Sequence, residues 1–229
     1  MDMNNLGVVK RNIVRADKAA VGKLSRFGVA TIHEAMGRVG LMKPYMRPVY
    51  TGAQICGTAV TVLLQPGDNW MMHVAAEQLQ PGDVVVAACT TDNTDGFFGD
   101  LLATSFQARG ARGLVIDGGC RDVKELQKMG FPVFSRAISA KGTIKATLGS
   151  VNIAVVCAGT TVNPGDVVIA DADGVVIVPA AIAQQVADAA EKRESFEGEK
   201  RAKLAAGVLG LDMYNMRGPL EKAGLRYID

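Results

Sequence analysis

The chain has 229 residues, of which 48% are hydrophobic and 21% charged, and its formal net charge is +2. This length fits a single domain over residues 1–229 that can bury a core without a disulfide or a metal. The small net charge argues against nucleic acid or an anionic membrane as a partner. The N-terminus has no secretory pattern, and no apolar run is long enough to span a bilayer. We therefore expect a soluble, cytoplasmic protein.

The four cysteines are spread widely along the chain, and no two form a CxxC pair: Cys56, Cys89, Cys120 and Cys157. Their spacing excludes a zinc-finger or redox motif. Most of them adjoin apolar, β-like runs, which predicts reduced thiols in or near the core. Cys120 is expected in a tight loop.

The N-terminal part of the chain predicts helices around one clear strand. Residues 13–27 have apolar positions at helical spacing. Thr31 and Glu34 have the spacing of a capping box, which predicts that a short helix opens there. Residues 56–64 form a continuous apolar run typical of a strand, and residues 69–80 predict another helix.

The tripeptide Pro-Gly-Asp occurs three times, beginning at Pro66, Pro81 and Pro164. Proline presets the first angle of a turn, and glycine accepts the positive φ that such a turn needs. The second and third copies run directly into strands expected over 84–87 and 167–170. Because the flanking sequences differ, we interpret this as recurrent turn chemistry rather than an internal repeat.

The rest of the chain alternates between the two element types. Helices are expected from Asp100, over 122–129 and over 180–206, and strands over 114–116, 131–134, 151–156 and 174–178. Short, valine-rich strands with only partial alternation favour a mixed sheet or a two-layer β core flanked by helices. The dinucleotide-binding fingerprint and the phosphate loop are both absent.

The most informative stretch is Gly99-Asp100, followed after twenty residues by Arg121-Asp122 and then by Glu125. Both ends fall at junctions between expected elements, where functional residues commonly lie. A fixed positive charge beside carboxylates suits a site that holds a divalent metal and an anionic substrate together. Such a hard cation needs only one or two protein carboxylates.

Each motif residue also has a plain structural interpretation. Asp100 and Asp122 could cap the helices that follow them, and Arg121 could be a surface charge. If a helix starts at Asp100, the N–H groups of Leu101 and Leu102 have no intrahelical partners and can bind a carboxylate. The residues alone leave both interpretations open, although the spaced set favours a functional one.

Other catalytic chemistries find little support in the sequence. His33 and His73 belong to no metal-binding spacing, so both are predicted to be structural. Ser105 lacks the frame of a hydrolase nucleophile. The chemistry is therefore expected to rest on the carboxylate and arginine motif.

The motif resembles that of a known family. Gly99-Asp100-x20-Arg121-Asp122-x2-Glu125 matches the signature of class II pyruvate aldolases of the 4-hydroxy-4-methyl-2-oxoglutarate / 4-carboxy-4-hydroxy-2-oxoadipate aldolase type. These enzymes are structurally related to the regulator of RNase E activity. The likeness extends over residues 29–35, 66–70, 95–104, 115–119, 163–166, 204–207 and 209–214.

The resemblance implies a compact α-β-β-α sandwich with a mixed central β core, of the RNase E regulator-like, swivelling β/β/α type. It implies a homotrimer or homohexamer with active sites between subunits. It also implies Mg²⁺ or Mn²⁺ bound directly by Asp122 and, through water, by Asp100 and by Glu197 from a neighbouring subunit's C-terminal helix. Glu199, two residues further along the same helix, is the alternative to Glu197.

The same resemblance assigns roles at the substrate. Asp100, Arg121 and Asp122 would be catalytic, and Gly99, Asp100, Leu101, Leu102 and Arg121 would bind the substrate. The amides of the two leucines would hold the pyruvyl carboxylate, while the arginine faces the C2 oxygen.

The implied reaction is retro-aldol cleavage of 4-carboxy-4-hydroxy-2-oxoadipate to pyruvate and oxaloacetate, and of 4-hydroxy-4-methyl-2-oxoglutarate to two pyruvates. Oxaloacetate decarboxylation is the expected side activity, and the setting would be bacterial protocatechuate or gallate 4,5-cleavage catabolism. One alternative is a non-enzymatic regulator that binds an RNase E-type nuclease. The others are another 2-oxo acid lyase or decarboxylase, and a Schiff-base aldolase using Lys124 or Lys145, although no pattern marks either lysine.

Overall fold

A computed structural model of the protein describes residues 6–229. The chain separates into two compact units, Met1–Ala190 and Glu191–Asp229. In the described part of the chain, every strand belongs to the first unit. Among residues 6–229, no helix combines the length and the apolar character needed to cross a membrane.

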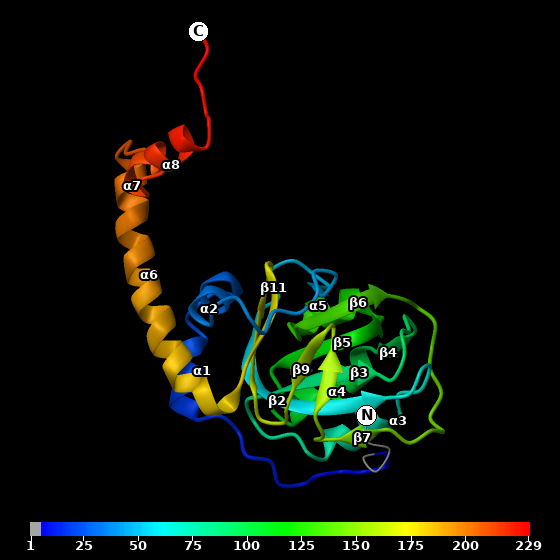
Figure 1. Cartoon of the computed structure of the whole chain (residues 1–229). Helices are drawn as coiled ribbons and strands as arrows, with labels where there is room; N and C mark the ends of the chain where they lie inside the picture. Colours follow the sequence, from blue (N-terminus) through cyan, green and yellow to red (C-terminus); the bar gives the residue numbers. More distant parts are fainter. Residues whose placement is uncertain (1–5) are drawn as a thin grey trace. The chain divides into compact units, whose positions relative to one another are not determined.

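The first unit is built on a mixed, nearly closed sheet (Figure 1). In spatial order its strands are β1 (Arg47–Pro48), β6 (Val133–Ile138), β5 (Gly113–Cys120), β3 (Asp83–Cys89), β2 (Ile55–Leu64), β10 (Val167–Asp171) and β11 (Gly174–Val178). Strands β6, β5, β3 and β2 run parallel to one another, whereas β1, β10 and β11 pair antiparallel with their neighbours. The edge strands approach each other, and the Arg47 guanidinium donates to the carbonyl oxygen of Asp173 at 3.4 Å.

Four shorter strands complete the β structure of the described residues. Strand β4 (Gly96–Phe98) pairs with β5, and β7 (Ser150–Val151) pairs with β2. Strands β8 (Val155–Cys157) and β9 (Thr160–Val162) form a separate antiparallel pair. The chain is therefore a mixed α/β protein, as the sequence predicts.

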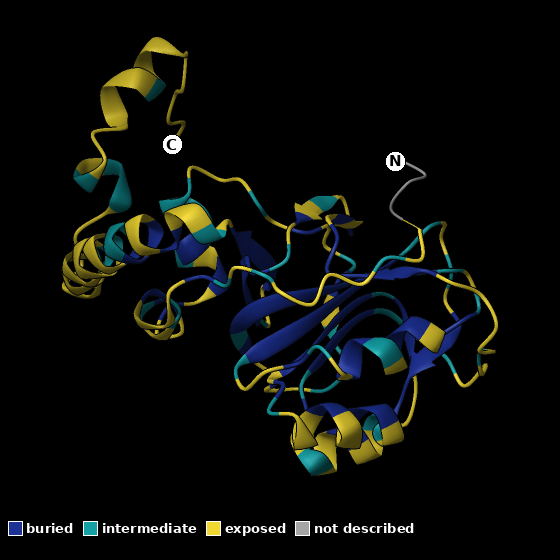
Figure 2. Ribbon diagram, turned by 90° about the horizontal axis from the view of Figure 1, so that it is seen from below, coloured by how far each residue is buried: buried dark blue, intermediate teal, exposed yellow. Residues whose placement is uncertain are grey.

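The central strands are buried on both faces, which explains their continuous apolar runs (Figure 2). Successive side chains of a strand point to opposite faces. Val60 and Val62 accordingly pack in one core, while Ala59 and Leu63 pack in another.

Helices cover the sheet through small sets of apolar residues. α3 (Trp70–Ala76), α4 (Asp100–Ala108) and α5 (Val123–Met129) contribute Met72, Ala103 and Leu126 to the first core. α1 (Lys18–Leu24), α2 (Val29–Ala35) and the start of α6 (Ala183–Ala205) pack with β10 and β11 in a third core.

All three Pro-Gly-Asp turns have the predicted geometry. Gly67, Gly82 and Gly165 have φ values of 71°, 99° and 88°. The aspartate that follows each glycine is buried, with 2% exposure at Asp68, 0% at Asp83 and 4% at Asp166. Each carboxylate accepts backbone N–H donors from nearby loops, so the three turns also fasten the loops around the sheet.

Two predictions for the N-terminal helices are wrong at their boundaries. The helix expected over 13–27 begins only at Lys18, where Asp17 caps it by accepting from two amides. The capping box expected at Thr31 does not form, because α2 already starts at Val29. The N–H of Val29 instead donates to Asp171 at 2.8 Å. A local cap thus fixes the start of α1, whereas a contact with a distant residue fixes the start of α2.

Other boundaries shift by a few residues. Cys120 is buried within β5 rather than placed in a loop. The run expected as one strand over 151–156 is broken at Asn152, which has a left-handed backbone with φ 60°. All four cysteines are free, as predicted.

The second unit consists of helical segments and a C-terminal stretch. It contains the part of α6 from Glu191 onward, α7 (Gly210–Met213) and α8 (Arg217–Lys222). The long helix ends before Gly207, whose φ is 91°. The Lys200 ammonium lies 4.6 Å from the centre of the Phe196 ring and 5.0 Å from that of Tyr214, which ties α6 to α7.

Candidate functional site

The motif residues meet at the carboxyl end of β5. Strand β4 lies beside the last residues of β5, with Phe98 paired to Cys120. Helix α4 begins directly after β4, and Arg121 and Asp122 directly follow β5. A Cβ atom at Gly99 would overlap the Oδ2 atom of Asp122, so only glycine permits this approach. The fold thus joins the two halves of the motif.

Asp122 precedes α5, but its carboxylate does not cap that helix. Its backbone is left-handed, with φ 58° and ψ 34°, and its side chain makes no capping hydrogen bond. The carboxylate lies among the motif residues instead: Oδ2 is 3.4 Å from the Nε of Arg121 and accepts the Asp100 N–H at 3.3 Å. The side chain therefore does not cap α5, the helix that it precedes, but accepts the first N–H of α4. Non-glycine residues with such a backbone cluster at functional sites.

Asp100 is the first residue of α4, and Gly99 occupies the cap position. The Oδ1 atom of Asp100 accepts the N–H of Leu101 at 2.8 Å. This amide, which the sequence predicts to be open to a substrate carboxylate, is therefore occupied in the structure. The Leu102 N–H has no acceptor among the described residues, and it lies where the helix dipole is positive.

A cavity of about 140 Å³ adjoins the motif. Apart from the motif and its neighbours, it is lined by residues of the α3 region and of the segment after β6: Asn69, His73, Gly142, Thr143 and Lys145. The sequence carries no spacing that links these residues to the motif, so reasoning from sequence missed them. It assigned His73 a structural role and considered Lys145 only as a Schiff-base alternative.

Two of these additional residues have distinctive surroundings. Asn69 is 8% exposed, and its Nδ2 donates to the Phe97 carbonyl at 2.8 Å, while its Oδ1 is buried without a hydrogen-bond partner. Burial and the charge of Lys145 both lower the pKa of His73. The cavity lining thus includes an asparagine whose buried amide oxygen is unpaired and an imidazole that favours its neutral form.

The segment that closes one side of the cavity is fixed by the first Pro-Gly-Asp turn. The Oδ2 of Asp68 accepts the N–H groups of Ala146 and Thr147, each at 2.7 Å, and its Oδ1 accepts that of Trp70 at 2.8 Å. Burial alone would raise the pKa of Asp68, but these hydrogen bonds outweigh it and lower the pKa. The ionised carboxylate therefore holds residues 144–147 beside the site.

The donor set fits a hard divalent cation. Within residues 6–229, no three His, Cys, Asp or Glu side chains form a metal-binding group. Magnesium, however, commonly binds through one or two carboxylates and keeps several waters. The Asp122 carboxylate makes no capping bond to α5, and Asn69, which lines the same cavity, has a buried amide oxygen without a hydrogen-bond partner. Asp122 and Asp100 are the residues that would hold such an ion.

The predicted carboxylates of the C-terminal helix belong to the second unit. Glu197 and Glu199 both lie in α6. Glu197 forms an ion pair with Arg193 one turn earlier, at 2.8 Å. Its role as a partner in a neighbouring subunit's site stays a prediction.

Comparison with known proteins identifies the family of this site. The RraA-like family, described as Aldolase/RraA, matches residues 29–177, which span both halves of the motif. The chain belongs to the RraA-like family. A protein of Halalkalibacterium halodurans named "Putative 4-hydroxy-4-methyl-2-oxoglutarate aldolase" is 28% identical over 183 residues, covering 80% of this chain and 87% of that protein.

Solved structures place the RraA-like chain in the same fold. Streptomyces coelicolor RraAS2, described as an unusual member of the RNase ES inhibitor RraA protein family, is 28% identical with a TM-score of 0.74 and covers 83% of this chain and 99% of its own. An uncharacterised Pseudomonas syringae protein superimposes with a TM-score of 0.78 at 24% identity, over 90% of this chain and 96% of its own. The predicted RNase E regulator-like fold is therefore confirmed, and the relatives' names include both aldolases and RNase inhibitors.

Proposed function

We propose that this RraA-like protein is a divalent-metal-dependent pyruvate aldolase. Its substrates would be 4-carboxy-4-hydroxy-2-oxoadipate and 4-hydroxy-4-methyl-2-oxoglutarate. The observation that carries the proposal is the Asp122 carboxylate, which sits on a left-handed backbone, does not cap the helix that follows it and lies beside Arg121 and Asp100 in one cavity. A regulator that only binds another protein has no need for this arrangement.

Asp122 would bind Mg²⁺ or Mn²⁺ directly, and Asp100 would hold a water of the same ion. Glu197 of a neighbouring subunit, or Glu199 in its place, would hold another. When bound, the ion supplies a Lewis acid beside the developing negative charge of the reaction. The active protein would then be an oligomer with shared sites, which the family resemblance implies to be a trimer or a hexamer.

The residues of the chain account for substrate placement. The free N–H of Leu102, at the start of α4, can bind the pyruvyl carboxylate. Binding through Leu101 as well requires that Asp100 release the N–H it now accepts. Arg121, whose backbone is anchored to the Phe98 carbonyl at 2.8 Å, would present its guanidinium to the C2 oxygen.

These contacts support a retro-aldol cleavage. The C4 hydroxyl loses its proton, the C3–C4 bond breaks, and its electron pair moves through C2 onto the C2 oxygen as pyruvate enolate. Arg121 stabilises that oxygen as its negative charge develops. Protonation at C3 then gives pyruvate, and C4 becomes the ketone carbon of the second product. Because oxaloacetate decarboxylation also forms pyruvate enolate, the same site would catalyse it as a side activity.

The test couples pyruvate release to NADH oxidation by lactate dehydrogenase, with each substrate in turn. We expect turnover that EDTA stops and added Mg²⁺ or Mn²⁺ restores. Arg121→Ala should lower kcat by about 10²- to 10³-fold, the usual effect of losing an oxyanion contact. Metal affinity, measured by titration, should change little. Arg109→Gln, a charge-matched substitution of an exposed arginine outside the cavity, is the control.

Other outcomes point to other functions. Turnover that resists EDTA and is trapped by borohydride would support a Schiff base, although Lys145 is exposed and Lys124 does not line the cavity. The absence of pyruvate from both substrates with every metal would contradict the aldolase proposal. Inhibition of an RNase E-type nuclease by the Asp122→Asn variant would then support the regulatory alternative.

A further inference from the structure

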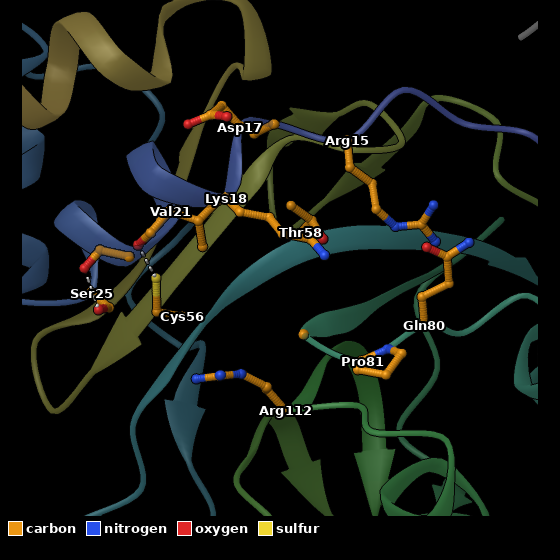
Figure 3. Close-up of a pocket in the computed structure, with 13 residues that line it drawn as sticks. Arg15, Asp17, Lys18, Val21, Ser25, Cys56, Thr58, Gln80, Pro81 and Arg112 are labelled. Atoms are coloured by element: carbon orange, nitrogen blue, oxygen red, sulfur yellow. Dashed lines mark hydrogen bonds between the residues drawn. The ribbon is translucent and has the colours of Figure 1, made fainter.

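A second, larger cavity lies away from the motif, in the first unit. Its volume is about 600 Å³, within the range of small-molecule sites. It is bounded by α1 and its preceding residues, by β2 near Cys56 and Thr58, and by the residues just before β3 and β5 (Figure 3). None of the residues with a role in the proposed reaction lines this cavity.

This cavity lies at the opposite end of the sheet from the candidate active site. Arg112, which lines it, immediately precedes β5, whereas Arg121 immediately follows the same strand. Strand β5 has eight residues, so the two arginine backbones are separated by roughly 25 Å. Ligands at the two places would therefore occupy separate sites.

Three basic side chains line the cavity, and one of them is already neutralised. Arg15 makes a bidentate contact with Asp83, in which its Nε and one terminal nitrogen each lie 2.8 Å from a carboxylate oxygen. Thr58 donates to the same carboxylate, which is fully buried. Arg15 and Asp83 therefore form a fixed, neutral wall.

The other two basic residues, Lys18 and Arg112, form no ion pair with any described acidic residue. The single acid in the lining, Asp17, is engaged in capping α1, accepting the N–H groups of Ala19 and Ala20. The cavity thus has two cationic groups without a matching anion.

Both cations line the same cavity. Figure 3 shows Arg112 extending beneath Cys56, and Lys18 directed toward Thr58. Burial raises the pKa of the Cys56 thiol to about 11, although the nearby positive charge of Arg112 opposes the rise. The thiol is thus protonated at neutral pH, and it adds no negative charge to the cavity.

We propose that this cavity binds a small organic or inorganic anion carrying at least two negative charges, held by Lys18 and Arg112. The guanidinium fork suits a planar pair of carboxylate or phosphate oxygens, and the lysine acts as a point charge. Both phosphorylated and polycarboxylate ligands share this chemistry. The uncharged surface of Val21, Pro81 and Gly82 leaves room for the rest of the molecule.

Binding is tested by calorimetric titration of the full chain in metal-free buffer at constant ionic strength. Pyrophosphate is the probe for phosphate-type ligands, and citrate is the probe for polycarboxylates. We expect at least one of them to bind with one site per chain. Lys18→Gln and Arg112→Gln should each weaken binding about tenfold or more, and the double variant should abolish it. Arg11→Gln, which removes an equal charge elsewhere, should bind as the wild type does.

A second measurement locates the ligand without any substitution. The bound anion should slow iodoacetamide modification of Cys56 several-fold, as read by mass spectrometry of its peptide. Cys89, which is also partly exposed but lies outside this cavity, is the internal control. The wild type binding neither probe would overturn the proposal. Binding that survives in the double variant but disappears in Arg121→Ala would also overturn it, because the anion would then occupy the motif site.

Discussion

At the scale of single residues, the backbone conformation of Asp122 lowers the stability of the fold at the proposed active site. A non-glycine residue in the left-handed region costs about 1–2 kcal/mol, because Cβ crowds the backbone. The side chain makes no capping bond to α5, and its contacts with the Asp100 N–H and the Arg121 Nε are long, at 3.3 Å and 3.4 Å. The position would be better filled by glycine if only the fold mattered. The retention of an acid there fits a functional requirement for its carboxylate.

We therefore predict that Asp122→Gly raises the free energy of unfolding by about 1 kcal/mol while removing aldolase turnover. Denaturant unfolding and the pyruvate assay measure the two effects. Arg38→Gly is the matched control, because Arg38 has φ 67° and lies outside the cavity. It should stabilise the protein and leave turnover unchanged. Retained turnover in Asp122→Gly would refute the metal-binding role of this residue.

His73 provides a prediction on pH. Burial and the positive charge of Lys145 both disfavour the imidazolium form, so the pKa of His73 lies below the ordinary value of about 6.5. Lys145→Gln removes the repulsion and should raise that pKa, while burial keeps it from exceeding the ordinary value. An NMR titration of the imidazole measures the pKa of His73 in the wild type and in the variant. An unchanged pKa in the variant would show that the two side chains do not interact.

The protonation of His73 also affects stability in a defined direction. Below about pH 6.5 the unfolded chain binds this proton more readily than the folded chain does. The contribution of His73 to stability is therefore present above that pH and declines as the pH falls toward the folded-state pKa.

The proximity of the motif residues could be predicted because chain order carries the signal, whereas their roles stay predictions. Asp100, Arg121 and Asp122 follow a fixed spacing, and the structure brings them together. Asn69 and His73 could not be found in this way. They reach the cavity from the α3 region, and only the pairing of strands brings that region beside the motif.

At the scale of elements, Asp68 connects one turn to the wall of the candidate site. Its carboxylate accepts three backbone N–H groups, two of them from residues 146 and 147. We predict that Asp68→Asn, which cannot accept all three equally well, lowers the free energy of unfolding by about 1–3 kcal/mol. Amide hydrogen exchange at Ala146 and Thr147 should accelerate, and KM should rise more than kcat falls.

Asp17→Asn provides the control for Asp68, because Asp17 accepts two amides at the exposed start of α1. It should have a smaller effect on stability and none on exchange at residues 146 and 147. The pKa of Asp68 is lowered in the fold, so its contribution is present above about pH 3.9 and is lost as the pH falls through the folded-state pKa. If amide exchange at residues 146 and 147 is unchanged in Asp68→Asn, the Asp68 carboxylate does not hold the cavity wall in place.

The strands were predictable as elements because burial on both faces leaves long apolar runs. The sequence predicts β2, β3, β10 and β11 to within a few residues. The start of α2 was less predictable, since the acceptor of its first N–H comes from a remote chain segment. Asp171 receives the first amide of α2 across 142 positions, and no local pattern around Thr31 reveals this contact.

At the scale of the whole molecule, the second unit exposes several large apolar side chains to solvent. Its exposed residues include Phe196, Leu209, Tyr214, Tyr227 and Ile228, with exposures between 47% and 90%. Exposed apolar groups on this scale commonly mark interaction surfaces. A second copy of the chain is the partner that the proposed shared active site requires. This arrangement would also bring Glu197 to a neighbouring subunit's Asp122.

Shared sites make a prediction about mixed oligomers. Asp122→Asn and Glu197→Ala should each be inactive alone, because each lacks one half of every site. When both chains are co-expressed at equal levels, random assembly gives about a quarter of the interfaces both native residues, so activity should recover to about a quarter of the wild-type value. Co-expression of Asp122→Asn with Arg121→Ala is the control, since both changes fall in the same half and no site is repaired. Mixed oligomers as inactive as the separate variants would show that Glu197 does not complete a neighbouring site. The same experiment with Glu199→Ala decides between the two glutamates, because only the essential one inactivates the chain alone and is repaired by mixing.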